Sequence, residues 1–179
     1  MIRILYVCTG NTCRSPMAEY ITQRLAREHN LSDQIIVSSA GVAALPGASM
    51  TPAAASALTR RGIDGAARHQ AARASQDRVA DIDLILTMSA AHKETLVARY
   101  PEAKDRIYTL LEYVSTLSHL TIDANGANGE NDNVTRHSPG SDIADPFGGD
   151  DDLYELTAAQ IETACRRLLE HLRVNLGKS

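Results

Sequence analysis

Aromatic residues and long apolar runs are scarce in this chain. Its 179 residues include no tryptophan, one phenylalanine and six tyrosines, so leucine, isoleucine, valine and alanine must form most of any core. No run of about 18 apolar residues occurs, which argues against a membrane-spanning helix. The apolar stretch at residues 2–7 is too short for the core of a signal peptide. We therefore expect a cytoplasmic protein that does not bind membranes.

Basic residues and cysteines are not abundant either. The formal net charge is −4 and the isoelectric point is about 5.8, so no basic excess indicates a nucleic-acid partner, although a local anion site is compatible with this charge. The cysteines are Cys8, Cys13 and Cys165, an odd number. In a reducing compartment this disfavours a disulfide framework and leaves catalysis, redox chemistry or burial as their roles.

Length and periodicity together predict the fold class. Short runs rich in β-branched residues predict four strands, at residues 2–7, 35–37, 83–88 and 107–110. Cap and proline patterns predict helices that begin at Ser15-Pro16, at Thr51-Pro52 and at Ser89, the last of which ends at Pro101. Because strands alternate with helices, we expect a single α/β domain over residues 1–179, with a four-stranded parallel sheet and flanking helices in three layers.

A long amphipathic helix is predicted at residues 153–176. Its inward face is expected to carry apolar side chains spaced by three or four residues, namely Leu153, Leu156, Ile161, Ala164, Leu168 and Leu172. Cys165 lies on the same face, and we expect it in the core.

Residues 118–142 interrupt the α/β pattern. They are rich in Asn, Gly, Asp and Ser and have no apolar periodicity, so we predict a flexible insertion or lid there. His119 and His137 lie in it among several acids, but without the spacing of metal ligands. We expect no metal.

The most informative segment is the loop at residues 8–16. It lies between the carboxyl end of the first strand and a helix N-terminus, where α/β proteins bind anions. Gly10 and Asn11 accept positive φ readily, which lets the loop curl and point its N–H groups inward. Arg14 can hold two phosphate oxygens with its planar guanidinium. Cys8 at the centre is expected to be a thiolate nucleophile, with Ser15 donating a hydrogen bond to it.

A cysteine nucleophile that displaces a phosphoryl group needs an acid for the leaving group and then a base for water. Asp145, in the sequence Asp-Pro-Phe-Gly-Gly at residues 145–149, is the candidate. The alternative is a plain turn before the last helix, because these residue types form turns in any case.

These motifs resemble a known family. Residues 8–19 read Cys-Thr-Gly-Asn-Thr-Cys-Arg-Ser-Pro-Met-Ala-Glu, and Asp-Pro-Phe follows at residues 145–147. Together with Ser-Ala-Gly at residues 39–41 and the order of strands and helices, they closely resemble the low-molecular-weight protein tyrosine phosphatases over nearly the whole chain. Relatives reach Asp-Pro-Phe sooner after residues 113–114, so residues 118–142 are the main departure.

The resemblance implies a phosphocysteine intermediate on Cys8 and Asp145 as general acid and then base. It implies that phosphate is held by Arg14, by Ser15 and by the loop residues Thr9, Gly10, Asn11, Thr12 and Cys13. It implies no metal or other cofactor, and phosphorylated proteins as partners. We expect a monomer.

Within the family, Thr12 and Asp-Pro-Phe-Gly-Gly look like the bacterial protein-arginine phosphatase branch, since tyrosine-specific relatives usually have an aliphatic residue at the position of Thr12. Asp145 can pair with a guanidinium as well as protonate its nitrogen. Phe147 is expected to form a wall of the substrate slot. Thr12 as an ordinary loop residue, and a tyrosine phosphatase, stay open.

Four further questions remain open. Cys13 is either a resolving thiol that forms a disulfide with oxidised Cys8 or a small buried residue under the loop. His69 could support the loop, but a histidine in a connecting segment more often faces solvent. Thiol-dependent arsenate reductases share this loop, but they need further cysteines in a mobile segment to pass on the disulfide, and Cys165 in the last helix is badly placed for that. A phosphate-binding module without catalysis is the remaining reading.

Overall fold

The sheet is parallel, with four strands. The computed structural model describes residues 1–120 and 140–176, and the side chains of all of these except residues 118–120. The strands are β1 (Ile2–Cys8), β2 (Ile35–Gly41), β3 (Leu84–Thr87) and β4 (Ile107–Thr109), in the spatial order β2-β1-β3-β4. Cys8 at the end of β1 is paired with Gly41 at the end of β2. The predicted α/β fold with four parallel strands is confirmed.

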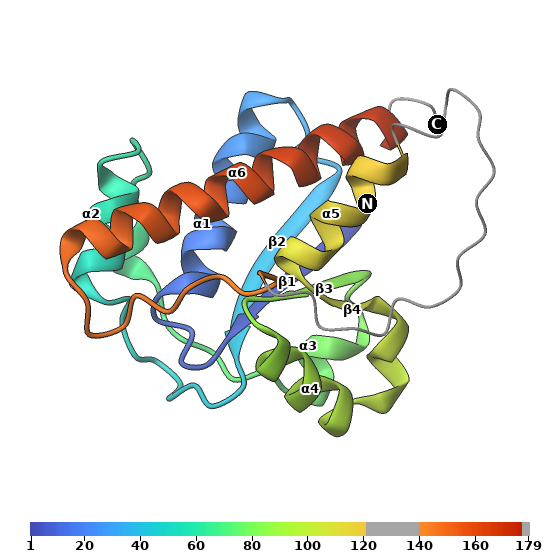
Figure 1. Ribbon diagram of the computed structural model, residues 1–179, viewed down its shortest axis with the longest axis horizontal. Helices are drawn as coiled ribbons and strands as arrows, with labels where there is room; N and C mark the ends of the chain where they lie inside the picture. Colours follow the sequence, from blue (N-terminus) through green and yellow to red (C-terminus); the bar gives the residue numbers. More distant parts are fainter. Residues whose placement is uncertain (121–139, 177–179) are drawn as a thin grey trace.

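Helices cover both faces of the sheet in three layers (Figure 1). One face carries α1 (Arg14–Glu28), α2 (Pro52–Thr59), α5 (Leu110–Leu120) and the long α6 (Asp151–Leu176), which packs across the other three. The opposite face carries α3 (Gln76–Ala80) and α4 (Ala90–Arg99). Short 3-10 turns lie at Ala66–Arg68 and Pro101–Arg106. Among the described residues, no helix combines the length and apolar character needed to cross a bilayer.

The strand β1 divides the core into two parts because its side chains alternate between the faces. Ile4, Tyr6 and Cys8 lie in the cluster shared with α1 and α6. Leu5 and Val7 lie in the cluster shared with α4. The nucleophile candidate Cys8 therefore ends the strand on the face that α1 covers, where the N-terminus of that helix begins.

Two helix starts follow the predicted cap chemistry and one does not. Thr51 accepts a hydrogen bond from the backbone N–H of Ala54, and Ser89 accepts one from that of His92. The expectation that Ser15 caps α1 is wrong, because Cys13 is the N-cap residue and Ser15 lies inside the first turn. The hydroxyl oxygen of Ser15 lies 3.0 Å from the sulfur of Cys8 and 3.2 Å from the carbonyl oxygen of Ala40, and it can donate to either.

The face of α6 also needs correction. Ile161, Ala164, Cys165, Leu168 and Leu172 are buried as predicted, but Leu156 is 68% exposed. Five residues along an α-helix turn the side chain by about 500°, so Leu156 points about 140° away from Ile161. Tyr154, Thr157 and Ala158 occupy the buried face in its place.

The start of the predicted insertion is helical. The helix α5 was not predicted; it runs to Leu120 and therefore includes residues 118–120. Residues 121–139 lie outside the described residues, as do His137 and the side chain of His119. At the far end the chain is fixed to the sheet, since the N–H of Ile143 donates to the carbonyl of Met88 at 2.8 Å.

Candidate active site

The loop at residues 9–13 connects β1 to α1 at the carboxyl edge of the sheet. Its backbone is held on two sides by neighbouring loops. The N–H groups of Val42 and Ala43 donate to the carbonyls of Cys8 and Thr9 at 2.9 and 3.0 Å. The N–H of Thr51 donates to the carbonyl of Thr12 at 2.9 Å. The loop is therefore rigidly held before any ligand is considered, as a preorganised anion site requires.

The sulfur of Cys8 faces hydrogen-bond donors. It lies 3.0 Å from the hydroxyl oxygen of Ser15 and 3.3 Å from the backbone nitrogen of Asn11, whose N–H donates to it. Cys8 is 3% exposed, and the first turn of α1 begins six residues later. Donors of this kind and a helix N-terminus both stabilise a thiolate relative to a thiol.

Asn11 is the structural centre of the loop. Its φ of 56° is left-handed, as expected from its position, whereas Gly10 does not adopt positive φ. The Asn11 side chain is fully buried. Its Nδ2 donates to the hydroxyls of Ser15 and Ser39 at 3.0 and 2.8 Å, and its Oδ1 accepts from the backbone N–H of Ala72 at 2.8 Å. One side chain thus fixes the loop, the first turn of α1 and the end of β2.

Gly41 allows the loop to approach the sheet. A Cβ atom at this position would collide with the carbonyl oxygen of Thr9 and lie 2.9 Å from the nitrogen of Asn11. The requirement for glycine is steric, because its φ is not in the left-handed region. This explains why the Ser-Ala-Gly sequence ends β2 at this point.

A second layer of polar residues supports Asn11. The imidazole Nε2 of His69 donates to the carbonyl of Asn11 at 2.7 Å, and His69 is only 8% exposed, so the expectation that it faces solvent is wrong. Glu19 accepts a hydrogen bond from Ser39 at 2.5 Å. Burial raises the pKa of the Glu19 carboxyl, and the hydrogen bond from Ser39 opposes that rise.

Arg14 and Asp145 meet across the site. The guanidinium Nη2 donates to Oδ2 of Asp145 at 2.5 Å, and Nη1 donates to the carbonyl of Ile143 at 3.0 Å. The Arg14 side chain is 7% exposed and the Asp145 side chain 51% exposed. The structure therefore brings together the two charged residues that the sequence analysis selected, 131 positions apart, with Asp145 open to solvent on one side.

The remaining predicted residues differ in how closely they approach this centre. Thr12 is partly buried in the loop. Cys13 is buried, with its sulfur 3.4 Å from the hydroxyl of Thr51 and 3.5 Å from that of Tyr154. Phe147 is 74% exposed, and only its backbone N–H contacts Asp145, at 3.2 Å.

His92, which was not predicted as a site residue, lies in the first turn of α4 and contacts Thr9 of the loop. Its Nε2 is 2.8 Å from the hydroxyl oxygen of Thr9, and its Nδ1 is 2.8 Å from that of Ser89. The local pattern carries a weak signal only, a histidine three residues after a helix-capping serine. Its contact with Thr9 spans 83 positions and depends on the packing of α4 beside the loop.

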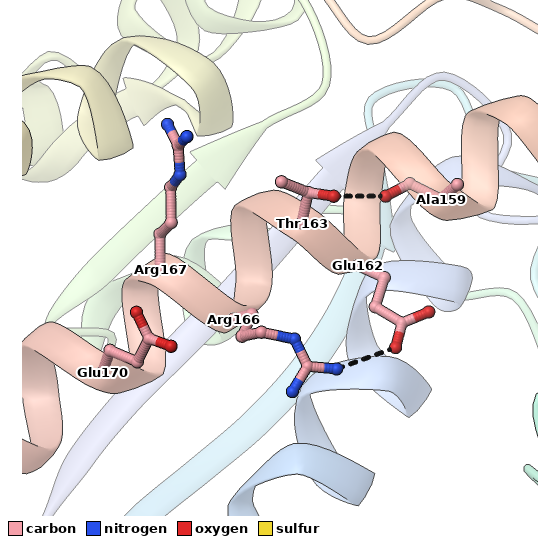
Figure 2. Close-up of a pocket in the computed structure, with 6 residues that line it drawn as sticks. All are labelled: Ala159, Glu162, Thr163, Arg166, Arg167 and Glu170. Atoms are coloured by element: carbon pink, nitrogen blue, oxygen red, sulfur yellow. Dashed lines mark hydrogen bonds and ion pairs between the residues drawn. The ribbon is translucent and has the colours of Figure 1, made fainter.

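Other parts of the described structure offer no comparable chemistry. A hollow of about 410 Å³ lies on α6, and all of its lining side chains, drawn in Figure 2, come from that helix. Arg166 and Glu162 there pair with each other at 3.1 Å, and Glu162 also pairs with Arg24. Within the described residues, no three His, Cys, Asp or Glu side chains are grouped as they would be around a metal ion.

Comparisons with known proteins agree with this geometry. A model of the family described as low molecular weight phosphotyrosine protein phosphatase matches residues 3–136. A protein-arginine-phosphatase of Geobacillus stearothermophilus is 36% identical over 171 residues, which cover 96% of each chain. A low molecular weight protein-tyrosine-phosphatase, PtpB, of Staphylococcus haemolyticus is 34% identical over 160 residues, covering 89% of this chain and 92% of its own.

A solved structure extends the likeness to the fold. It is an arginine phosphatase, YwlE, in a cysteine-to-serine mutant with a phosphorylated active site serine. It superposes with a TM-score of 0.77 at 33% identity and covers 96% of this chain and 95% of its own. The chain belongs to the low molecular weight phosphotyrosine protein phosphatase family.

Proposed function

We propose that this protein is a protein-arginine phosphatase that works through a phosphocysteine intermediate. The observation that carries the proposal is the ion pair between Arg14 and Asp145 at the start of α1, where the next residue, Ser15, contacts the Cys8 sulfur. It combines a nucleophile, a guanidinium that can bind phosphate and a half-exposed carboxyl group in one site. Two of the arginine phosphatases that the chain resembles over nearly their whole length support the choice of substrate.

In the first step the Cys8 thiolate attacks phosphorus, and the bond between phosphorus and the guanidine nitrogen breaks. Asp145, in its protonated form, gives its proton to the departing nitrogen, so arginine leaves as a neutral guanidine that is then protonated by water. Arg14 and the loop N–H groups, from Thr9 to Cys13, stabilise the charge on the phosphoryl oxygens. In binding phosphate, Arg14 exchanges Asp145 for phosphoryl oxygens, which frees the carboxyl group for proton transfer.

In the second step Asp145 is the base. Its carboxylate takes a proton from water, and the resulting hydroxide attacks phosphorus, which breaks the bond to sulfur and releases inorganic phosphate. The Cys8 sulfur leaves as a thiolate, which the hydroxyl of Ser15 and the N–H of Asn11 stabilise. The cycle thus returns the site to its starting state without a metal or other cofactor.

Arginine selectivity is assigned to residues at the edge of the site. Asp145 is open enough to pair with a substrate guanidinium, and Thr12 contributes a hydroxyl and a methyl group to the loop. Phe147 is placed two residues after Asp145 with an exposed ring, and we propose that it covers one face of the planar guanidinium. Binding of a phosphoprotein would bury this ring.

A tyrosine phosphatase is the second candidate, because the same acid would protonate a phenolate and PtpB is also similar over most of both chains. An arsenate reductase is disfavoured. Its relay needs further reactive thiols in a mobile segment, whereas Cys165 is fully buried in α6 and burial raises its pKa to about 11.

We also propose that Cys8 and Cys13 form a reversible disulfide when Cys8 is oxidised. Both are free thiols within one short loop, and a neighbouring thiol protects a sulfenic acid from further oxidation. The contacts of Cys13 with Thr51 and Tyr154 also fit the competing reading, a packed core residue. The reducing environment of the cytoplasm would return such a disulfide to two thiols, so the cycle is reversible there. For the oligomeric state, a monomer remains the prediction.

Substitution of Thr12 tests the selectivity. The kcat/KM ratio for phosphoarginine over phosphotyrosine peptides is measured for the unmutated protein, Thr12→Ile and Thr12→Val. Valine has nearly the shape of threonine without the hydroxyl, so it is the matched control for shape. We expect isoleucine to lower the ratio by about tenfold or more, the size of a small change in a specificity pocket. An unchanged ratio in Thr12→Ile would remove Thr12 from the selectivity.

A further inference from the structure

His92 is a buried histidine that the mechanism above does not use. It is 6% exposed, and both of its ring nitrogens have polar partners. Nδ1 lies 2.8 Å from the hydroxyl oxygen of Ser89, and Nε2 lies 2.8 Å from the hydroxyl oxygen of Thr9, the residue after the nucleophile. It therefore connects the first turn of α4 to the nucleophile loop.

The imidazole is neutral at physiological pH. Burial lowers the pKa of His92 to about 4, the charge of Arg14 acts in the same direction, and Asp145 and Asp142 oppose it only in part. A neutral imidazole carries one hydrogen, so one ring nitrogen donates and the other accepts. The position of that hydrogen decides what Thr9 can do.

Hydrogen-bond accounting places the hydrogen on Nε2. Ser89 is buried, and its hydroxyl oxygen already accepts from the backbone N–H of His92 at 3.4 Å. The hydroxyl hydrogen of Ser89 also needs an acceptor, and among the described residues Nδ1 of His92 is the one within hydrogen-bond distance. With Nδ1 as an acceptor, Nε2 carries the hydrogen and donates to Thr9.

This assignment turns Thr9 into a donor. Its hydroxyl oxygen accepts from His92, so its own hydrogen is free for another partner. In the opposite tautomer the Thr9 hydrogen would be used by Nε2, and only lone pairs would remain for an anion. The carbonyl of Thr9 is fixed by the N–H of Ala43 at 3.0 Å, and the residue is exposed to solvent next to Cys8.

We propose that His92 is a positioning residue that presents the Thr9 hydroxyl as a hydrogen-bond donor to the phosphoryl group of the substrate. The inference rests on the proposed phosphatase function and deepens it, since it applies to a phosphoryl group on arginine or on tyrosine. The chain of donation runs from Ser89 through His92 to Thr9. It supplies the site with a side-chain donor besides Arg14 and the loop amides.

Two substitutions of His92 separate positioning from packing. The amide nitrogen of glutamine reaches about as far as Nε2, so His92→Gln keeps a donor for Thr9. Asparagine is shorter by one methylene group and reaches only as far as Nδ1, so His92→Asn loses the donor to Thr9, and its larger loss of volume is followed by thermal unfolding. Thr9→Val removes the hydroxyl from an exposed residue, with little risk to folding, and the Thr9→Val/His92→Asn double variant completes the cycle.

The measurements are kcat and KM with an aryl phosphate and the inhibition constant of inorganic phosphate. In Thr9→Val and in His92→Asn we expect KM and the phosphate inhibition constant to rise about tenfold, the loss expected for one hydrogen bond to a charged group. The double variant should lose no more than either single variant. His92→Gln should recover phosphate binding to within about threefold of the unmutated protein.

Three results would overturn the inference. The first is an equal loss of phosphate affinity in His92→Gln and His92→Asn, which would indicate packing alone. The second is a loss in the double variant equal to the product of the two single losses. The third is unaltered phosphate binding in Thr9→Val. Thermal unfolding of each variant identifies any loss that comes from misfolding. If the unmutated protein neither hydrolyses aryl phosphate nor binds phosphate, the proposed function itself fails. That outcome differs from an active unmutated protein whose phosphate binding is unchanged by substitution of His92.

Discussion

Replacing Asn11 by glycine and by alanine separates two contributions to the nucleophile loop. Asn11 has a left-handed φ of 56°, and its side chain makes three hydrogen bonds, to Ser15, Ser39 and Ala72. Glycine loses the hydrogen bonds but accepts the backbone angle. Alanine loses the hydrogen bonds and is also strained at this φ.

The magnitudes follow from these contacts. Each buried hydrogen bond contributes about 1 kcal/mol, so Asn11→Gly should lower the free energy of unfolding by about 3 kcal/mol. Alanine at positive φ is about 1 kcal/mol worse than glycine, so Asn11→Ala should cost about 4 kcal/mol. Both variants should lose most of their activity, because the same side chain holds the loop around Cys8.

Asn30 supplies the matched control. It has the same φ of 56° at the end of α1, but it is exposed, and its side chain has no hydrogen bond among the described residues. Urea unfolding should show little change for Asn30→Gly and about 1 kcal/mol of destabilisation for Asn30→Ala. Equal costs at Asn11 and Asn30 would refute the reasoning, because the hydrogen bonds of Asn11 would then contribute nothing.

Two further predictions concern stability. Glu162 pairs with Arg24 of α1 and with Arg61 after α2. Burial raises the pKa of Glu162, but these arginines hold it below its usual range. Glu162→Gln should therefore lower the free energy of unfolding by about 1 kcal/mol in urea titrations at pH 7, and this cost should shrink as the pH falls below the usual pKa of a glutamate. The pKa of His92 is about 4 when folded and 6.5 in the unfolded reference, so the unfolded chain binds more protons between these values. The stability that neutral His92 contributes should therefore be complete above pH 6.5 and be lost as the pH falls towards 4, with a shallower acid decline in His92→Gln.

Local chemistry made much of the fold and site predictable. The strand β1 is a short β-branched run, and the caps at Thr51 and Ser89 are properties of a few adjacent residues. The loop could be recognised for the same reason, since Cys8, Asn11 and Arg14 are close in sequence and their roles depend on one strand-to-helix turn. The sequence placed Arg14 and Asp145 in the same active site but did not predict a contact between them, and the structure shows their ion pair.

The features that the sequence did not predict have three different physical origins. His69 and His92 are polar residues whose burial depends on segments 58 and 83 positions away, which no local pattern contains. Leu156 is apolar but lies on the exposed side of α6, because a hydrophobic residue is tolerated on the surface and only the helical phase decides its direction. The helix α5 was missed because it begins directly at the end of β4, without a loop or a proline to mark it.

The most direct test of the central claim compares two substrates of the unmutated protein. Peptides of one sequence, carrying phosphoarginine or phosphotyrosine at the same position, are hydrolysed under identical conditions, and Cys8→Ser is the inactive control. The account predicts a kcat/KM for phosphoarginine that is higher than that for phosphotyrosine by about tenfold or more. An equal or higher kcat/KM for phosphotyrosine would contradict it.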